Sequence, residues 1–206
     1  MTLTIWTYDW VPEGPRGHVR DIRLRWAAEE AGLPYEVRTL THKEKGAPEW
    51  LARQPFAQVP ALDDGAVRLF ESGAGVLHIA EKSEALLPRD PVERGAVLSW
   101  VIAALNSVEM VTVPRWYIAL RAEETPLDKW QATRLSRLAA ALGERSWLVA
   151  DRFTAADLMM AEVLRMPLKQ GLLAEHPALA SYVERATARP AFQKALAGQM
   201  ALYGEG

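Results

Sequence analysis

The stretch from Leu87 to Pro91 separates two parts of the sequence that differ in hydrophobic pattern. Before it, short runs rich in β-branched and aromatic residues alternate with helical periodicity, and after it apolar residues recur at helical spacing almost throughout. Proline-rich segments of this kind are typical of boundaries between domains. The pattern therefore predicts an α+β domain over residues 1–83, a linker over 84–91 and an all-helical domain over 92–206.

The first domain is predicted to contain the elements β-α-β-α-β-β-α. Residues 3–8 and 35–40 have the composition of strands, and the helical pattern over 17–31 between them ends at Gly32. A strand, a helix and a strand of these lengths are typical of a parallel βαβ unit.

The second half of this domain is predicted to form a short helix, a hairpin and a further helix. The short helical segment lies around residues 49–53. An Asp-Asp-Gly turn ending at Gly65 separates the apolar runs 59–62 and 66–70, which is a strong hairpin signal. Ser72 can cap the helix that follows.

The second domain is predicted to consist of helices alone. Its first helix is long and has one apolar face, formed by Leu98, Val101, Ile102, Leu105, Val108 and Thr112. A second helix is expected over residues 127–142, and residues 154–157 resemble a capping box that opens a third. The dipeptides His176-Pro177 and Arg189-Pro190 are typical of the starts of two more.

Composition excludes several classes of function. The 206 residues include no cysteine, so disulfides, thiolate zinc sites, iron–sulfur clusters and a cysteine nucleophile are excluded. The 24 Lys and Arg residues against 26 Asp and Glu give a formal charge of −2, too little positive charge to attract nucleic acid or an anionic membrane. The four histidines are scattered without metal-ligand spacing, so no metal is expected.

The sequence favours a cytoplasmic protein without a membrane segment. No run approaches the ~18 uninterrupted apolar residues that a membrane helix needs. The first ten residues have neither the basic region nor the cleavage site of a signal peptide.

The tripeptide Gln58-Val59-Pro60 is a candidate peptide-binding element. A proline at the start of a strand cannot donate to the sheet. If the Val59–Pro60 bond is cis, the Val59 N–H and C=O turn away from the sheet and can pair with an extended peptide. The alternative is a trans proline on an edge strand, which is the commoner case in general.

Glu71 and Ser72 form a second candidate element. They follow a predicted strand and open a helix, whose N-terminal N–H groups and serine hydroxyl suit a carboxylate. Glu71 beside them can hold an ammonium group. Together they suit the α-amino acid end of a ligand, whereas the alternative is an ordinary serine cap beside a solvated glutamate.

Taken together, several motifs resemble those of the cytosolic glutathione transferases. Residues 54–62, 64–65 and 69–74 resemble that family's glutathione-site signature, and the set continues in order over nearly the whole chain. The remaining matches are to its first helix and second strand, its helical-domain capping box and its C-terminal helices: residues 26–36, 153–157, 176–182 and 189–192.

The resemblance implies a thioredoxin-like N-terminal domain joined to a helical bundle, a homodimer, and glutathione as co-substrate. It implies that Pro60 is the cis-proline, that Val59 pairs with the cysteinyl unit, and that Glu71 and Ser72 hold the γ-glutamyl end. It further assigns Gln58 to fixing the peptide. Cations for the glycine carboxylate would come from His42 and Lys43, with Lys45 as an alternative to Lys43.

The residue that activates the thiol is left open between two candidates. A free cysteine thiol has a pKa of about 8.5, so the protein must stabilise the thiolate. The family does this with a hydroxyl or a cysteine near the end of the first strand, but no Cys, Ser or Thr lies between Tyr8 and Leu33. Tyr8 and Arg16 are therefore the leading pair: a hydroxyl at the strand end, and a guanidinium at the helix start. Asp21 would repel a thiolate.

The second substrate is expected to be a hydrophobic electrophile. Trp10, Trp116 and Tyr117 are candidates for its pocket, with core packing as the competing explanation. The resemblance thus implies a glutathione transferase of the detoxification type. The alternatives are a glutathione-dependent isomerase or peroxidase, and a non-catalytic interaction protein with the same fold.

Overall fold

A computed structural model describes residues 2–119 and 125–204. In this structure the chain forms two compact units. Unit 1 contains the chain up to Leu86 and again from Arg189, and unit 2 spans Leu87–Ala188. The first boundary lies inside the stretch that the sequence assigns to a linker. The sequence assigns the last helix to the helical domain, whereas its contacts place it in unit 1.

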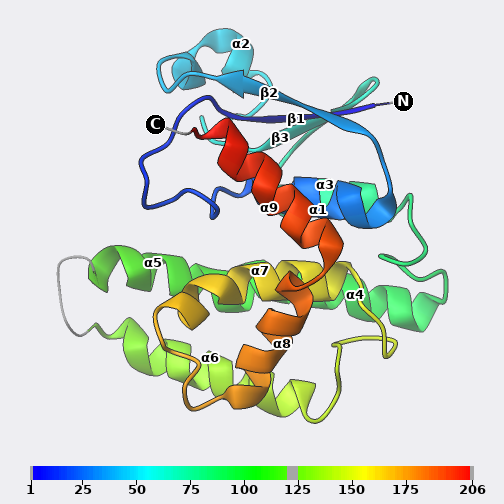
Figure 1. Cartoon of the computed structure of the whole chain (residues 1–206), viewed down its shortest axis with the longest axis vertical. Helices are drawn as coiled ribbons and strands as arrows, with labels where there is room; N and C mark the ends of the chain where they lie inside the picture. The colour runs from blue at the N-terminus through cyan, green and yellow to red at the C-terminus, as the bar shows by residue number, and fades with distance from the viewer. Residues whose placement is uncertain (1, 120–124, 205–206) are drawn as a thin grey trace. The chain divides into compact units, whose positions relative to one another are not determined.

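Unit 1 is built on a four-stranded sheet with the strand order β2-β1-β3-β4. Strand β1 pairs in parallel with β2 and antiparallel with β3, which is antiparallel to β4. The strands are β1 (Leu3–Tyr8), β2 (Tyr35–Leu40), β3 (Ala61–Asp64) and β4 (Val67–Phe70). Helices α1 (Asp21–Ala31) and α3 (Ser72–Ala80) cover one face of the sheet and α2 (Pro48–Leu51) lies on the other (Figure 1). This topology confirms the expected thioredoxin-like domain.

The alternation of β1 fixes which side chains reach each face. Leu3, Ile5 and Thr7 are buried, and the residues that alternate with them are half-buried. Two of these half-buried residues, Trp6 and Tyr8, pack against a small core formed by Leu40, Trp50 and Ala61. Because side chains alternate along a strand, Tyr8 at the end of β1 lies on the same face as Trp6.

Helix α1 begins four residues later than the sequence predicts. Gly17 has φ 76°, outside the right-handed helical region, and the preceding residues form turns closed by hydrogen bonds from Arg16 to Glu13 and from His18 to Pro15. The helix ends as expected at Gly32, whose φ of 65° is left-handed and whose N–H caps two carbonyls of α1.

Unit 2 consists of helices, as the sequence predicts. They are α4 (Pro91–Ala103), the π-helical segment η2 (Ala104–Glu109), α5 (Met110–Ala119), α6 (Leu127–Leu142), α7 (Ala155–Lys169) and α8 (Pro177–Thr187). The capping box that opens α7 is present: the Asp157 carboxylate accepts from the Thr154 N–H at 2.9 Å. Asp157 also accepts from the Leu148 N–H at 2.8 Å, which ties the loop before α7 to the helix.

The apolar face predicted for the long first helix is only partly buried. Ile102, assigned to that face, is 48% exposed. The buried stripe recurs at steps of four and three and consists of Val97, Val101, Ala104, Val108 and Val111. Ile102 follows a stripe residue directly, and a neighbour in sequence points about 100° away around a helix.

The helix Pro91–Ile118 is long and apolar enough to cross a membrane by length and composition alone, since an 18-residue stretch of it has a mean hydropathy of 1.7. A core helix of a soluble protein passes the same test. In unit 2 this helix packs against α6 and α7.

Helix α9 (Pro190–Leu202) packs along α1 and belongs to unit 1. The Arg189 guanidinium before it pairs with both carboxylate oxygens of Glu30, at 2.6 and 2.7 Å. The rings of Trp26 and Phe192 meet edge to face, with their centroids 4.7 Å apart.

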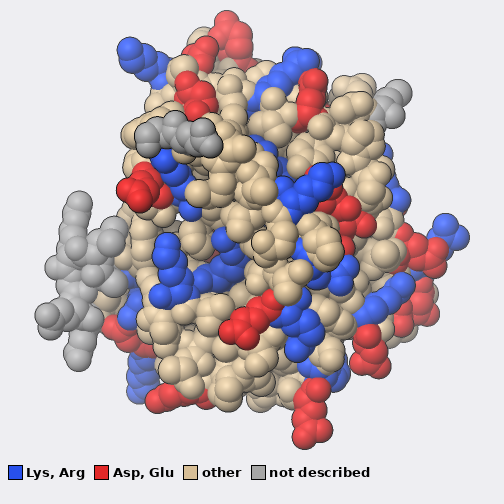
Figure 2. All heavy atoms as spheres, in the orientation of Figure 1, with Lys and Arg blue, Asp and Glu red and all other residues tan. Residues whose placement is uncertain are grey.

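Over the surface visible in Figure 2, Lys and Arg side chains are interspersed with Asp and Glu.

Candidate functional site

The sheet register brings four chain segments to one edge of unit 1. Tyr8 ends β1 opposite Leu40, the last residue of the parallel strand β2. At the same edge β3 begins, because Ala61 pairs with Trp6. Ala61 also pairs with Phe70, the last residue of β4. Residues directly after β1, β2 and β4 and directly before β3 therefore gather at this edge.

Val59 offers an unpaired backbone at this edge. The Val59–Pro60 peptide bond is cis. Within the part of the chain that the structure describes, neither the N–H nor the C=O of Val59 makes a hydrogen bond. Its side chain packs with Tyr8 against the core of Leu40, Trp50 and Ala61. The main chain of Val59 is thus held in place yet free to pair with an extended ligand.

The loop before Val59 is fixed by two side chains whose role the sequence does not reveal. The buried Gln54 carboxamide oxygen accepts from the N–H groups of Phe56 at 2.7 Å and Gln58 at 3.3 Å. The Trp50 indole N–H donates to the Gln58 carbonyl at 3.2 Å. The main chain of Gln58 is used in these contacts, while its side chain is exposed.

Ser72 opens α3 and is 5% exposed, with Arg23 beneath it. Arg23 Nη1 donates to Ser72 Oγ at 3.1 Å. Because a guanidinium only donates, the serine oxygen is the acceptor here, and its own proton is left for another acceptor. This polarity suits a carboxylate. Glu71, directly before the helix, is exposed and has φ 70°.

Arg23 is a functional candidate that sequence reasoning missed. Its spacing with Arg16 and Arg20 predicts a solvated cationic face, yet Arg23 is only 3% exposed. The available signal is that α1 carries two apolar stripes and is covered on both sides. An arginine in the middle of such a helix is buried and needs an acceptor.

His42 and Lys43 follow β2 and are exposed. The His42 ring stacks on the Tyr8 ring, with centroids 4.2 Å apart and planes 16° from parallel. His42 Nε2 donates to the Trp10 carbonyl oxygen at 3.0 Å. Lys43 directly precedes the 3-10 helix η1 (Glu44–Gly46). The edge of the site thus carries an imidazole, a lysine and a phenol.

The Tyr8 hydroxyl points to the loop before Val59. Its distance to the Ala57 carbonyl oxygen is 3.5 Å, at the outer limit of a hydrogen bond. Burial raises the pKa of Tyr8, so the hydroxyl keeps its proton at neutral pH and acts as a donor. A weakly engaged donor of this kind can turn to a better acceptor.

Arg16 lies in the segment between β1 and α1. Its Nε is 3.4 Å from the Val11 carbonyl oxygen, and its Nη1 is 3.4 Å from that of Gly204. Both contacts are long, so the guanidinium is held only weakly by the chain itself.

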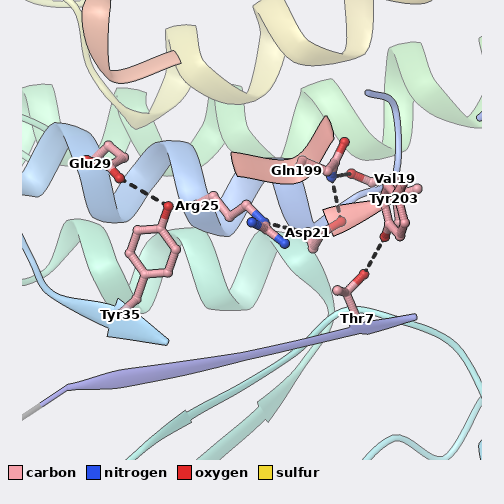
Figure 3. Close-up of polar contacts among 8 residues, drawn as sticks. All are labelled: Thr7, Val19, Asp21, Arg25, Glu29, Tyr35, Gln199 and Tyr203. Atoms are coloured by element: carbon pink, nitrogen blue, oxygen red, sulfur yellow. Dashed lines mark hydrogen bonds and ion pairs between the residues drawn. The ribbon is translucent and has the colours of Figure 1, made fainter. Parts of the chain in front are cut away.

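Asp21, which the sequence suggests would repel a thiolate, is fully buried and faces other partners. Arg25 Nε lies 2.7 Å from one carboxylate oxygen, and Gln199 Nε2 lies 2.6 Å from the other (Figure 3). Burial raises the pKa of Asp21, and the hydrogen bonds from Arg25 and Gln199 oppose that rise. The carboxylate therefore belongs to the interior of unit 1.

The residues predicted for the hydrophobic pocket are divided between the units. Trp10 is 54% exposed in unit 1. Trp116 and Tyr117 lie on α5 in unit 2, where their rings meet at 4.8 Å and 70°. Their role in substrate binding stays a prediction. Over residues 2–119 and 125–204, no group of three or more His, Asp or Glu side chains is placed to hold a metal ion.

Both parts of the chain match models of known domains. Residues 14–81 match the model described as "Glutathione S-transferase, N-terminal domain". Residues 122–190 match the model described as "Glutathione S-transferase, C-terminal domain".

Two curated proteins are similar over most of the chain. Glutathione S-transferase 3 of Zea mays is 31% identical over 199 residues, which cover 85% of this chain and 88% of that protein. The disulfide-bond oxidoreductase YfcG of Escherichia coli (strain K12) is 28% identical over 199 residues, covering 88% of this chain and 90% of that protein.

Solved structures share the fold at lower identity. A glutathione transferase family member from Pseudomonas fluorescens pf-5, with two glutathione bound, gives a TM-score of 0.82 at 22% identity, covering 95% of this chain and 92% of its own. Glutathione transferase URE2P8 from Phanerochaete chrysosporium, with oxidized glutathione, gives a TM-score of 0.82 at 20% identity. The match covers 98% of this chain and 96% of that one. This likeness confirms a thioredoxin-like domain combined with an all-helical domain.

Proposed function

Because the chain belongs to the glutathione S-transferase family, we propose that unit 1 binds glutathione and presents its thiolate to a hydrophobic electrophile. The observation that carries this proposal is the unpaired main chain of Val59, at the same sheet edge as Tyr8 and Ser72. An extended tripeptide needs main-chain partners for its middle and polar groups for its ends, and this edge offers both.

Each part of glutathione has a candidate partner. The Val59 main chain pairs with the cysteinyl unit, as in the addition of a strand to a sheet. Ser72, whose hydroxyl proton is free to donate to a carboxylate, takes the γ-glutamyl carboxylate, and Glu71 takes the ammonium. The remaining candidates are Pro60 and Gln58, which shape the loop, and His42 and Lys43, which face the glycine carboxylate.

The chemistry requires a thiolate held beside a neutral donor. Glutathione releases its thiol proton to water. The Tyr8 hydroxyl leaves the Ala57 carbonyl and donates to the sulfur, which favours the thiolate over the thiol. The sulfur then attacks the electrophilic carbon. A carbon–sulfur bond forms, and the leaving group departs with the electron pair of the bond that breaks. Trp10, in the same unit as Tyr8, is the proposed contact for the electrophile.

Loss of the Ser72 hydroxyl is expected to weaken glutathione binding. In Ser72→Ala the ligand carboxylate loses a hydrogen bond, and Arg23 Nη1 loses its hydrogen bond to the serine oxygen. We expect the dissociation constant to rise about tenfold, as for the loss of one charge-assisted hydrogen bond. Isothermal titration calorimetry with glutathione measures this.

Ser99→Ala is the matched control, because Ser99 lies in unit 2 and donates only to the carbonyl of Gly95 in its own helix. Equal glutathione affinities of the wild type, Ser72→Ala and Ser99→Ala would contradict the assignment of Ser72 to the site.

A wild-type protein that binds glutathione but turns over no electrophile would favour a non-catalytic function.

Glutathione-dependent reduction of a disulfide is a second candidate, favoured by the similarity to the E. coli disulfide-bond oxidoreductase. The chain has no cysteine, so both reacting thiols would come from glutathione. One glutathione thiolate attacks the disulfide, forms a mixed disulfide and releases a thiolate. A second glutathione thiolate attacks the mixed disulfide, which yields oxidised glutathione and the second reduced thiol. Parallel assays with an aryl halide and a small disulfide separate the two functions.

We further propose that the protein acts as a cytoplasmic homodimer. Several apolar side chains of the long helix 91–119 are exposed by 43–79%, namely Val92, Ile102, Met110, Tyr117 and Ile118. In unit 1, Phe56 is 63% exposed and touches the ring of Phe70. Apolar surfaces of this kind are typical of interfaces between subunits.

The dimer is expected to weaken when Phe56 is replaced with serine. The loss of a large aromatic contact raises the dimer dissociation constant at least tenfold. Sedimentation velocity over a concentration series measures this, with Leu51→Ser, another exposed apolar position, as the control. A wild type that sediments as a monomer at every concentration would contradict the proposal.

A further inference from the structure

The end of α9 and the residue after it contact both flanks of the segment between β1 and α1, which spans residues 9–20. Just before this segment, near the end of β1, the hydroxyl of Thr7 lies 2.9 Å from that of Tyr203, and both residues are buried. At its end, Gln199 Nε2 donates to the Val19 carbonyl at 2.9 Å and to the Asp21 carboxylate at 2.6 Å. Figure 3 shows these contacts converging from α9 and the residue after it onto β1 and α1.

The middle of the segment has a further contact with the end of the chain. Arg16 Nη1 reaches the Gly204 carbonyl oxygen at 3.4 Å. Residues 199–204 therefore contact the end of β1 that leads into segment 9–20, the middle of the segment and its last residues. This segment carries Arg16 and Trp10, and it directly follows Tyr8.

These contacts are separate from those that dock the helix. Along the rest of α9 and just before it, Arg189 pairs with Glu30 at 2.6 Å and Lys194 pairs with Glu29 at 2.8 Å. The rings of Phe192 and Trp26 pack together as well. The helix is therefore attached to α1 by contacts other than those of Gln199, which bonds to Val19 and Asp21, and of Tyr203, which bonds to Thr7 in β1.

We propose that Gln199 and Tyr203 are positioning residues of the thiol site. By fixing the end of β1 before segment 9–20 and the last residues of the segment, they set where Tyr8 and Arg16 stand relative to the glutathione sulfur. The inference rests on the proposed function. It assigns a role in the first unit's chemistry to residues that follow the helical domain in sequence.

The test uses Tyr203→Phe, which removes one hydroxyl and keeps the ring. Amide hydrogen exchange in segment 9–20 is expected to become about tenfold faster, since one buried hydrogen bond that restrains the segment is lost. In the conjugation assay we expect kcat to fall about tenfold while KM for glutathione stays within about twofold. The pKa of the bound thiol, followed by its ultraviolet absorbance, is expected to rise.

Two further variants test the hydrogen bond. Thr7→Val removes the partner hydroxyl, which also hydrogen-bonds the Asp21 carboxylate, so its effect should be at least as large as that of Tyr203→Phe. Adding Tyr203→Phe to Thr7→Val should cause no further loss. Lys194→Ala removes an exposed ion pair of the same helix and should leave exchange, kcat and the thiol pKa unchanged.

The outcomes separate this inference from the proposed function. Unchanged exchange in segment 9–20, or equal effects in Tyr203→Phe and Lys194→Ala, would overturn the inference in a protein that still binds glutathione. A wild type that binds no glutathione would overturn the proposed function, and the positioning role would fall with it.

Discussion

Replacing Asp21 with alanine is expected to lower the free energy of unfolding by about 3–5 kcal/mol. Asp21 is fully buried, and its carboxylate accepts hydrogen bonds from Arg25 and Gln199. Its loss leaves the guanidinium of Arg25, itself 3% exposed, without a counter-charge in the interior. Guanidinium chloride denaturation followed by circular dichroism measures the change.

Two control variants test that reasoning. In the double variant Asp21→Ala with Arg25→Leu the unpaired charge is gone, so much of the lost stability should return. Glu36→Ala removes an exposed carboxylate that pairs with Arg38 and should change stability by no more than about 0.5 kcal/mol. An Asp21→Ala protein as stable as Glu36→Ala would contradict the account of the buried network.

The pH dependence of Asp21→Asn follows from the same burial. Because burial raises the pKa of Asp21, the folded state holds this proton to a higher pH than the unfolded chain does. The stability that the proton on Asp21 contributes to the folded state is therefore complete below the pKa of aspartate in the unfolded chain, about 3.9. This contribution is lost as the pH rises through the pKa of Asp21 in the folded state. Asparagine resembles the protonated acid at every pH. The wild type should thus lose stability relative to Asp21→Asn as the pH rises through this window, and a difference independent of pH would contradict the raised pKa.

Replacing Tyr8 with phenylalanine is expected to lower kcat/KM for conjugation by about 10–100-fold. The hydroxyl is the donor proposed for the glutathione thiolate, and it keeps its proton because burial raises the pKa of Tyr8. Without this donor the pKa of the bound thiol should rise by one to two units, which at about 1.4 kcal/mol per unit accounts for the rate loss. Ultraviolet titration of the glutathione complex and the pH dependence of kcat/KM measure the shift.

Arg16→Gln is the matched comparison, because the sequence leaves Tyr8 and Arg16 as alternative activators. Among the described residues, Arg16 makes only long contacts, with Val11 and Gly204, so its side chain can be replaced without disrupting a buried bond there. A larger shift of the thiol pKa in Arg16→Gln than in Tyr8→Phe would assign the sulfur to the guanidinium. If neither variant shifts that pKa, both assignments are wrong.

Local pattern predicted most of the fold, because strand alternation, the Gly32 cap and the 154–157 capping box act over a few residues. The start of α1 was missed because the left-handed backbone of Gly17 interrupts a sequence whose side-chain spacing still looks helical. The exposure of Ile102 was missed because adjacent apolar residues on a helix do not reveal which of them faces the core.

The unpredicted parts of the site depend on contacts between residues far apart in sequence. Arg23 and Ser72 are 49 residues apart, and Gln199 and Asp21 are 178 apart. No periodicity in a single segment encodes such pairs. The break in backbone pairing at Val59, in contrast, can be expected from the sequence, because a proline at the start of a strand already implies it. Its role in binding stays a prediction.

The most direct test of the central claim is a titration of isotope-labelled protein with glutathione, followed by the backbone amide resonances of Val59 and Ser72. The account predicts saturable shifts of both resonances with a single dissociation constant, since in the proposed complex the Val59 N–H pairs with the cysteinyl unit and Ser72 meets the γ-glutamyl end. Resonances of Val59 and Ser72 that stay unmoved at saturating glutathione, or shifts confined to the helical unit, would contradict it.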